Sequence, residues 1–204
     1  MIVEPGARLM SKYLRGAPPS HWMAAVCDMN FDQDIHRELL RWIIQHRSCE
    51  QAVALAAYWY LGPRWYAQFP DRDSLGSSEE RTTFDLLREI EQRYERNFYR
   101  NGNIGFDPGN DVFGSESYTR GYDWTTDYAD RPLARPIPVL MLRAIPGEKI
   151  FSSAPELGTW IEGLPEHLWN AADNSSGSRI GNATIIFSLI CNTITGHVPS
   201  LKTI

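Results

Sequence analysis

Metal-ion chemistry is the first possibility to weigh, because the chain has five histidines and three cysteines. No histidines form an H-E-x-x-H pair, and no cysteine and histidine stand at the spacing of zinc ligands. His36 and His46 are ten residues apart, which on one helix places them about 80° apart around the axis and too far apart along it to share an ion. We therefore expect no metal and no cofactor, and a surface or rim position for these two histidines.

Three further motifs approach a functional pattern without meeting it. A nucleophilic serine needs G-x-S-x-G, but in the segment Gly177–Gly181 the serine comes one position too early. The glycines between 102 and 114 lack the Lys-Ser/Thr ending of a phosphate-binding loop. The segment Asp107–Asp111 has oxygen ligands that suit calcium but not the spacing of a calcium loop. We expect it to form a turn held by its Asp and Asn side chains.

Paired carboxylates remain an open alternative. A hydrolase or transferase can work with one Asp/Glu acid–base pair, which needs only the right separation in space. The chain has 25 acidic residues, and sequence does not give the distances between them. We assign no catalytic residue and keep this enzyme class as the alternative hypothesis.

Acidic and aromatic residues alternate in the glycine-rich segment 101–131. Aromatic side chains dominate protein interfaces, and acids around them steer a basic partner. A disordered tract would be poor in aromatics, so we expect an ordered loop. The candidate partner-binding residues are Asp107, Asp111, Glu116, Tyr118, Tyr122, Asp123, Trp124 and Asp127. The competing interpretation is that half of the aromatics fill the core while the acids merely face water.

Composition narrows the class of partner and the compartment. The net charge of −5 argues against a dedicated nucleic-acid binder and is compatible with a basic protein partner. Cys27, Cys49 and Cys191 are odd in number and widely spaced, which indicates free thiols in a reducing compartment. The start of the chain lacks the apolar run of a secretion signal, and no apolar run is long enough to span a membrane. A cytoplasmic location is expected, with the oligomeric state left open and an oligomerisation module as a third hypothesis.

Helical periodicity dominates the first half of the chain. Residues 30–62 read as two helices that break at Arg47-Ser48, with Ser48 and Gln51 as a capping box and Gly62-Pro63 as the end. The second of these helices, from 52 to 61, is apolar enough to be buried on most sides. A further helix is expected at 20–29 after an irregular lead-in over 1–19. The clearest amphipathic helix spans about 78–99, behind a Ser77–Glu80 capping box.

The second half is less regular. Short helices are expected at 139–145, 156–162 and 166–172, where prolines suit the first turn. Residues 180–194 fit a helix better than a strand. The predicted fold is all-α: one compact domain over 1–204, with a helical N-terminal half at 20–100, a long ordered loop at 101–136 and a helical C-terminal half at 137–204.

Four features between residues 30 and 59 resemble a bacterial domain family of unknown function, numbered 4274. They are Asn30-Phe31-Asp32, the run Arg41-Trp42-Ile43-Ile44, Cys49, and the alanine-rich apolar run 52–59. Phe31 replaces a tryptophan of the family pattern, and the residues at 50–53 also depart from it. The resemblance implies a small helical bacterial domain, of a kind often found beside toxin and secretion genes, with no catalytic residues to transfer. It suggests an immunity protein that neutralises a cognate toxin or effector by occluding it.

Overall fold

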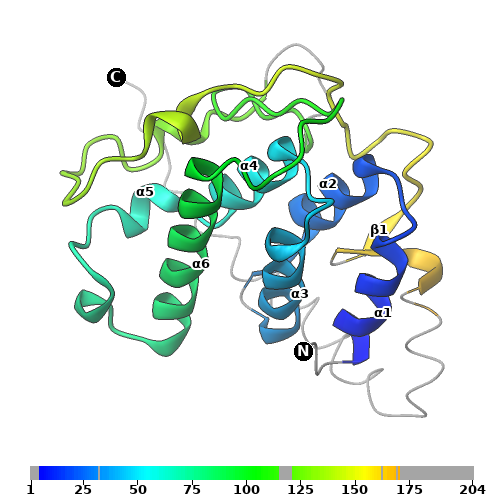
Figure 1. Cartoon of the computed structure of the whole chain (residues 1–204), viewed down its shortest axis with the longest axis horizontal. Coiled ribbons are helices and arrows are strands. Elements are labelled where there is room, and N and C mark those ends of the chain that lie inside the picture. The colour runs from blue at the N-terminus through cyan, green and yellow to red at the C-terminus, as the bar shows by residue number, and fades with distance from the viewer. Residues whose placement is uncertain (1–4, 32, 115–120, 162, 169, 171–204) are drawn as a thin grey trace, which may run out of the picture. The chain divides into compact units, whose positions relative to one another are not determined.

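The computed structural model describes residues 5–31, 33–114, 121–161, 163–168 and 170. The chain divides into two units, Met1–Glu166 and His167–Ile204. The first unit carries the architecture shown in Figure 1. The segment 180–194, expected to be helical, and Cys191 lie outside the described residues.

The first unit is helical, which confirms the all-α prediction. Its α-helices are α1 (Pro5–Leu14), α2 (Pro19–Asp28), α3 (Asp34–Gln45), α4 (Gln51–Tyr60), α5 (Pro63–Tyr66) and α6 (Ser78–Glu95). The described residues also form three short 3-10 helices. Helix η1 (Arg72–Ser74) lies between α5 and α6, and η2 (Trp124–Thr126) and η3 (Val139–Leu142) come after α6. Strands β1 (Trp160–Ile161) and β2 (Leu164–Pro165) pair antiparallel. No helix in the described part of the chain has the length and apolar content needed to cross a bilayer.

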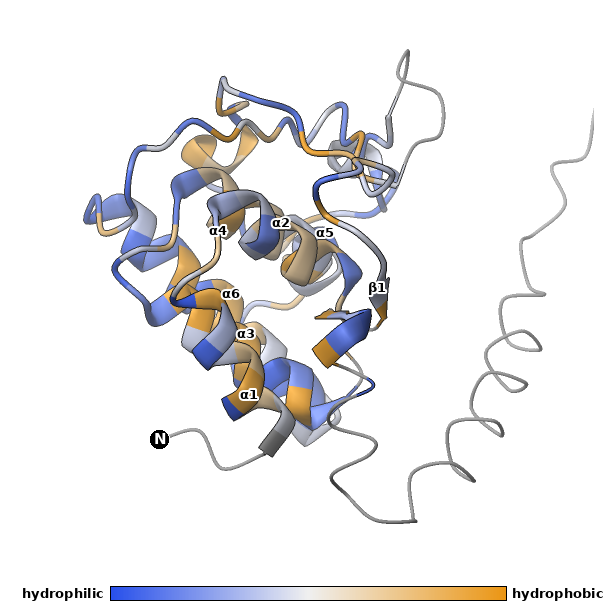
Figure 2. Cartoon of the chain, turned by 90° about the vertical axis from the view of Figure 1, so that its right-hand side faces the viewer, coloured by the Kyte–Doolittle hydropathy of each residue, from blue (hydrophilic) through white to orange (hydrophobic). Residues whose placement is uncertain are grey.

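Helix α4 is the centre of the core. Every residue from 52 to 59 is fully buried, as its apolar composition predicted. It packs against α2, α3 and α6, which cover different sides of it. Figure 2 shows both polar and apolar residues on α1, α3 and α6, as expected for helices that bury one face. The helix ends where predicted, because Gly62 adopts the left-handed conformation, with φ of 68°.

One predicted capping box is present and the other is wrong. Ser77 accepts a hydrogen bond from the Glu80 amide, and the Glu80 side chain accepts one from the Ser77 amide. At α4, in contrast, Glu50 and not Ser48 precedes the first helical residue. Here the backbone pairs with a distant segment, because the Gln51 amide donates to the Arg100 carbonyl at 2.9 Å. That long-range pair replaces the local cap.

Three expectations about local structure are also corrected. The lead-in over 1–19 contains α1, which buries Ala7, Met10 and Leu14 at helical spacing. The helix expected at 156–162 is replaced by a turn and the β1–β2 hairpin, whose Gly163 amide donates to Asp28 at 2.8 Å. The short helix expected at 139–145 is the 3-10 helix η3.

The two central histidines lie deeper than expected. His36 is buried, and its ring nitrogen Nδ1 lies 2.7 Å from the Asn30 carbonyl oxygen. His46 is half-buried, with its ring 4.9 Å from the ring of Trp42. Both histidines therefore pack within the fold. The surface or rim position expected for His36 is wrong, because that residue is buried.

Residues 101–114 and 121–150 form a layer of loops over one end of the helices (Figure 1). Isolated backbone bridges connect different segments of this layer: Ile104 with Glu148, Phe106 with Ile145, and Asp111 with Tyr122. Trp59 of α4 donates its indole N–H to the Met141 carbonyl at 2.8 Å. The layer is thus bonded both to itself and to the core helix.

Replacing Ser77 by alanine tests the capping box. We expect Ser77→Ala to lower the free energy of unfolding by about 1 kcal/mol, because the Glu80 amide loses its acceptor. Urea denaturation measures the change. The matched control is Ser78→Ala, since the Ser78 hydroxyl is exposed and donates only to the neighbouring Glu79 side chain. Equal losses in the two variants would refute the capping role.

Candidate binding surface and cavity

The predicted loop is held in place by a backbone pair between Asp111 and Tyr122. The Asp111 amide donates to the Tyr122 carbonyl at 2.8 Å, and the Tyr122 amide donates back at 2.7 Å. Gly121 is required beside this pair, because a Cβ atom there would lie 1.9 Å from the Asp111 carbonyl oxygen. The glycines that suggested an irregular segment thus permit a close crossing of two chain segments.

Asp111 uses its carboxylate to support the loop from within. One oxygen accepts from the Phe113 amide at 3.0 Å, and the other accepts from the Trp124 indole N–H at 2.9 Å. The residue is only 7% exposed. Both carboxylate oxygens are therefore occupied inside the protein, and Asp111 moves from a candidate contact to a residue that positions Trp124.

Tyr122 and Trp124 stand on the outer side of this support. Tyr122 is 55% exposed, and its hydroxyl donates to Asp127 at 2.5 Å. That hydrogen bond, followed by partial burial, raises the pKa of Tyr122 to about 12. The Trp124 ring is half-buried, with its centroid 4.8 Å from the rings of both Tyr122 and Tyr60. Asp123 begins η2 by accepting from the Thr125 amide at 2.9 Å.

Tyr128 lies beside them in a conformation that is unusual for an aromatic residue. Its φ is 51°, in the left-handed region, where a side chain with a Cβ is strained. Its ring is 42% exposed and lies 5.5 Å from the ring of Trp65. The Arg131 guanidinium lies 5.4 Å from the same ring. Strain of this kind persists only where neighbouring contacts fix it, and it often accompanies a functional site.

We call the resulting group the aromatic–acidic surface: Tyr122, Asp123, Trp124, Asp127 and Tyr128. Four of these were predicted from sequence. Tyr128 was not, although it directly follows Asp127 in the same run of acids and aromatics. Phe106 and Phe113 are buried, so part of the loop's aromatic content does fill the core. Glu116 and Tyr118 lie outside the described residues.

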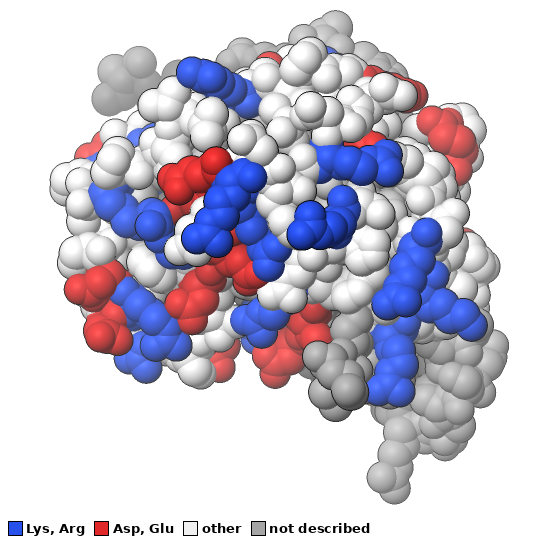
Figure 3. All heavy atoms as spheres, in the orientation of Figure 1, with Lys and Arg blue, Asp and Glu red and all other residues white. Residues whose placement is uncertain are grey.

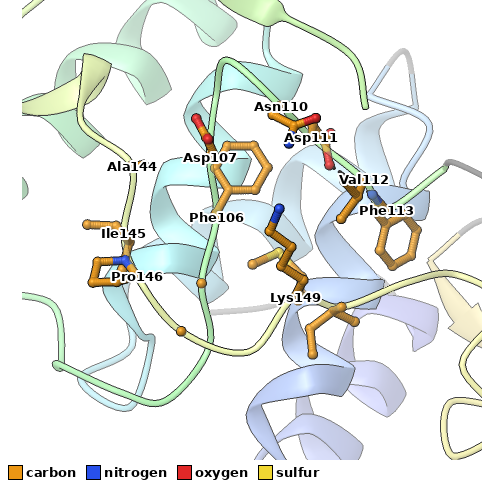
Figure 4. Close-up of a pocket in the computed structure, with 14 residues that line it drawn as sticks. Phe106, Asp107, Asn110, Asp111, Val112, Phe113, Ala144, Ile145, Pro146 and Lys149 are labelled. Atoms are coloured by element: carbon orange, nitrogen blue, oxygen red, sulfur yellow. Dashed lines mark hydrogen bonds between the residues drawn. The ribbon is translucent and has the colours of Figure 1, made fainter. Parts of the chain in front are cut away.

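A small cavity of about 190 Å³ lies behind this loop, between residues 105–113 and 144–150. Asp107 and Asp111 contribute to its wall, together with apolar side chains such as Phe106, and Figure 4 shows Lys149 pointing into it. The Gly109 amide donates to Asp107 Oδ1 at 2.9 Å, which confirms the predicted side-chain-held turn. The two predicted aspartates thus both line this cavity, and Asp111 also bonds to Tyr122 and Trp124 of the aromatic–acidic surface.

This cavity is poorly suited to acid–base catalysis. Asp111 already gives both oxygens to internal donors, and Asp107 gives one oxygen to the Gly109 amide. Nearby, burial and the charge of Asp111 raise the pKa of the Cys27 thiol, and burial raises the pKa of Cys49. Neither thiol is therefore activated as a nucleophile. Within the described residues, no three His, Cys, Asp or Glu side chains are grouped to hold a metal ion.

Comparison with known families gives a match to the helical part of the chain and none to the loop layer. Residues 17–95 match a family model described as a domain of unknown function, DUF4274. This confirms the resemblance noted in residues 30–59. The DUF4274 region begins just before α2 and ends with the last residue of α6, so it covers the core helices and stops before the loop layer.

No curated protein and no solved structure matches the chain. The aromatic–acidic surface and the cavity both lie C-terminal to the DUF4274 region. Their function must therefore be argued from their own chemistry.

The bond between Trp124 and Asp111 can be tested with Trp124→Phe. Phenylalanine keeps an aromatic ring against Tyr60 but removes the donor to a buried carboxylate, which costs about 1–3 kcal/mol. We expect that loss in urea denaturation, with faster amide exchange across 121–128. Trp65→Phe is the matched control, because the contacts of that side chain are with aromatic rings and an arginine. A control loss as large as the test loss would show that ring size alone matters.

The strain at Tyr128 can be measured by comparing two truncations. Tyr128→Ala and Tyr128→Gly both remove the ring, but only glycine relieves the positive φ. We expect the glycine variant to be more stable than the alanine variant by about 1 kcal/mol in chemical denaturation. Two variants of equal stability would mean that the backbone at this position is not strained.

Proposed function

We propose that the chain is a protein-binding module that contacts a basic partner through the aromatic–acidic surface. The observation that supports this most directly is that Tyr122 and Tyr128 are exposed and yet held by specific contacts. Exposed aromatic rings in fixed positions lose little conformational entropy on binding. They resemble the central residues of interface hot spots.

The charge around these rings fits a basic partner. The segment 121–131 contains Asp123, Asp127 and Asp130, opposed only by Arg131. Asp130 is exposed, and Asp127 has one oxygen bonded to Tyr122. Such a group of acids raises the rate of encounter with a positively charged surface.

Helix η3 adds exposed apolar side chains to the same layer of loops. Val139 is 64% exposed, and Leu140 and Leu142 are also exposed, while Met141 between them is buried. The Met141 carbonyl accepts the Trp59 indole N–H, which fixes the orientation of the turn. An apolar patch on rigid backbone supports macromolecular contact, because single-domain proteins seldom expose several large apolar residues together.

The specific form of the proposal is an immunity protein. Its partner is a cognate toxin or effector, which the bound chain occludes, in the cytoplasm of a bacterial cell. Supporting this are the resemblance to the DUF4274 family and the acidic character of the surface. The alternative of a hydrolase or transferase gains no support from the cavity, since Asp111 is already committed to internal hydrogen bonds.

The test is binding to the product of the adjacent gene, measured by calorimetry after co-expression and separation. Tyr122→Ala combined with Tyr128→Ala is expected to weaken binding at least about thirtyfold, the effect of losing a hot spot. Raising the ionic strength is expected to slow association, because the acids steer the partner.

The control variant combines Arg72→Ala with Asp85→Ala, which removes an exposed ion pair on η1 and α6. It is expected to bind as the unmodified chain does. Absence of binding by the unmodified chain, or a double tyrosine variant that binds normally, would refute the proposed surface.

A further inference from the structure

A different face of the first unit carries a group of arginines that line two adjoining hollows. Figure 3 shows Lys and Arg side chains on the face in view, with Asp and Glu side chains among them. The first hollow, of about 500 Å³, is lined by Arg47, Arg93 and Arg96 around Phe98. The second, of about 170 Å³, is lined by Arg15 and Arg100, with the buried Glu50 also in its wall. The hollows adjoin because Ser48 of the second follows Arg47 of the first along the chain.

Most of this positive charge is not neutralised by neighbouring acids. Arg93 pairs with Glu89 at 2.8 Å, and Glu89 also accepts from Gln45 at 2.9 Å, so that acid is occupied. Arg100 is 3.6 Å from the buried Glu50 carboxylate, but its side chain remains 61% exposed.

No carboxylate in the described ranges forms an ion pair with the three remaining arginines, Arg15, Arg47 and Arg96. We define the arginine band as Arg15, Arg47, Arg96 and Arg100.

Aromatic rings hold parts of this band in place. The Arg47 guanidinium lies 5.4 Å from the centre of the Phe98 ring, and Arg93 lies 4.4 Å from the same ring. Arg15 lies 5.8 Å from the ring of Trp42. Burial, together with the positive charge of Arg15, lowers the pKa of the adjacent His46. The guanidinium groups of Arg15 and Arg47 therefore lie against aromatic rings in the absence of a ligand.

The kind of partner follows from what the band lacks. The large apolar side chains that are exposed in the described part of the chain all lie between 122 and 142, outside the band. A protein interface needs an apolar centre, whereas binding to a phosphate backbone needs mainly positive charge. Arginine also matches the geometry of phosphate oxygens with two parallel N–H bonds.

We infer that the arginine band binds the phosphate backbone of a nucleic acid that lies across the two hollows, without reading its sequence. This inference is the opposite of the expectation, drawn from the net charge of −5, that the chain does not bind nucleic acid. That expectation averaged the whole chain, whereas a ligand responds to the local field of one face. The inference does not depend on the proposed protein partner, because the two surfaces share no residue.

The test uses fluorescence anisotropy with the full chain and a labelled single-stranded oligonucleotide of about ten nucleotides, a length typical of one such site. Four backbone contacts predict that the logarithm of the binding constant falls with the logarithm of the salt concentration with a slope of about −3. Arg47→Gln combined with Arg96→Gln is expected to halve that slope to about −1.5. It is also expected to weaken binding at least tenfold at low salt.

Matched controls separate a specific band from general charge. Arg72→Gln with Arg143→Gln removes the same charge from exposed arginines outside the hollows and is expected to bind normally. Circular dichroism establishes that both double variants are folded. The inference is overturned by an oligonucleotide that does not bind at low salt, or by equal losses in the two double variants. It is overturned equally if poly-glutamate or anionic lipid vesicles bind as tightly as the oligonucleotide.

Discussion

The complete burial of α4 is the constraint on which the rest of the structure depends. A helix that is apolar on all sides must be covered on all sides. Helices α2, α3 and α6 cover most of it, and the loop layer covers the remainder. Trp59 and Tyr60, at the end of α4, meet Met141 and Trp124 of that layer. Residues 101–114 and 121–131 of the glycine-rich segment are thus held in place because the core helix requires a cover.

The same cover is secured by one buried acid, Glu91 of α6. Its carboxylate accepts from the Tyr58 hydroxyl at 2.9 Å and pairs with Arg135 at 3.3 Å and with Arg88. A buried carboxylate is stable only when its charge and lone pairs are satisfied. The three donors come from α4, α6 and the segment that leads to η3. Glu91 therefore fixes the layer that displays Val139 and Tyr128 relative to the helices.

Sequence predicted the features whose causes are local. The Ser77–Glu80 capping box and the spacing of apolar residues predict helix α6. The apolar composition of α4 and the glycine at position 62 predict that helix and its end. Failures arose where the cause is distant in sequence. Ser48 is a good cap by type, yet the Gln51 amide bonds to Arg100 instead. Asp111 looks like its acidic neighbours in sequence, and the bond that its second oxygen accepts from the distant Trp124 indole could not be read from them.

Charge illustrates the same difference between local and average properties. A net charge of −5 describes the whole chain and does not give the charge of any one part of its surface. Asp123, Asp127 and Asp130 follow one another in the loop layer. The arginine band draws on three separate segments, which contribute Arg15, Arg47, and Arg96 with Arg100. Acids that are neighbours in sequence were visible before the fold was known. Arginines assembled by the packing of α1, α3 and α6 were not, so the positive surface could only be found in three dimensions.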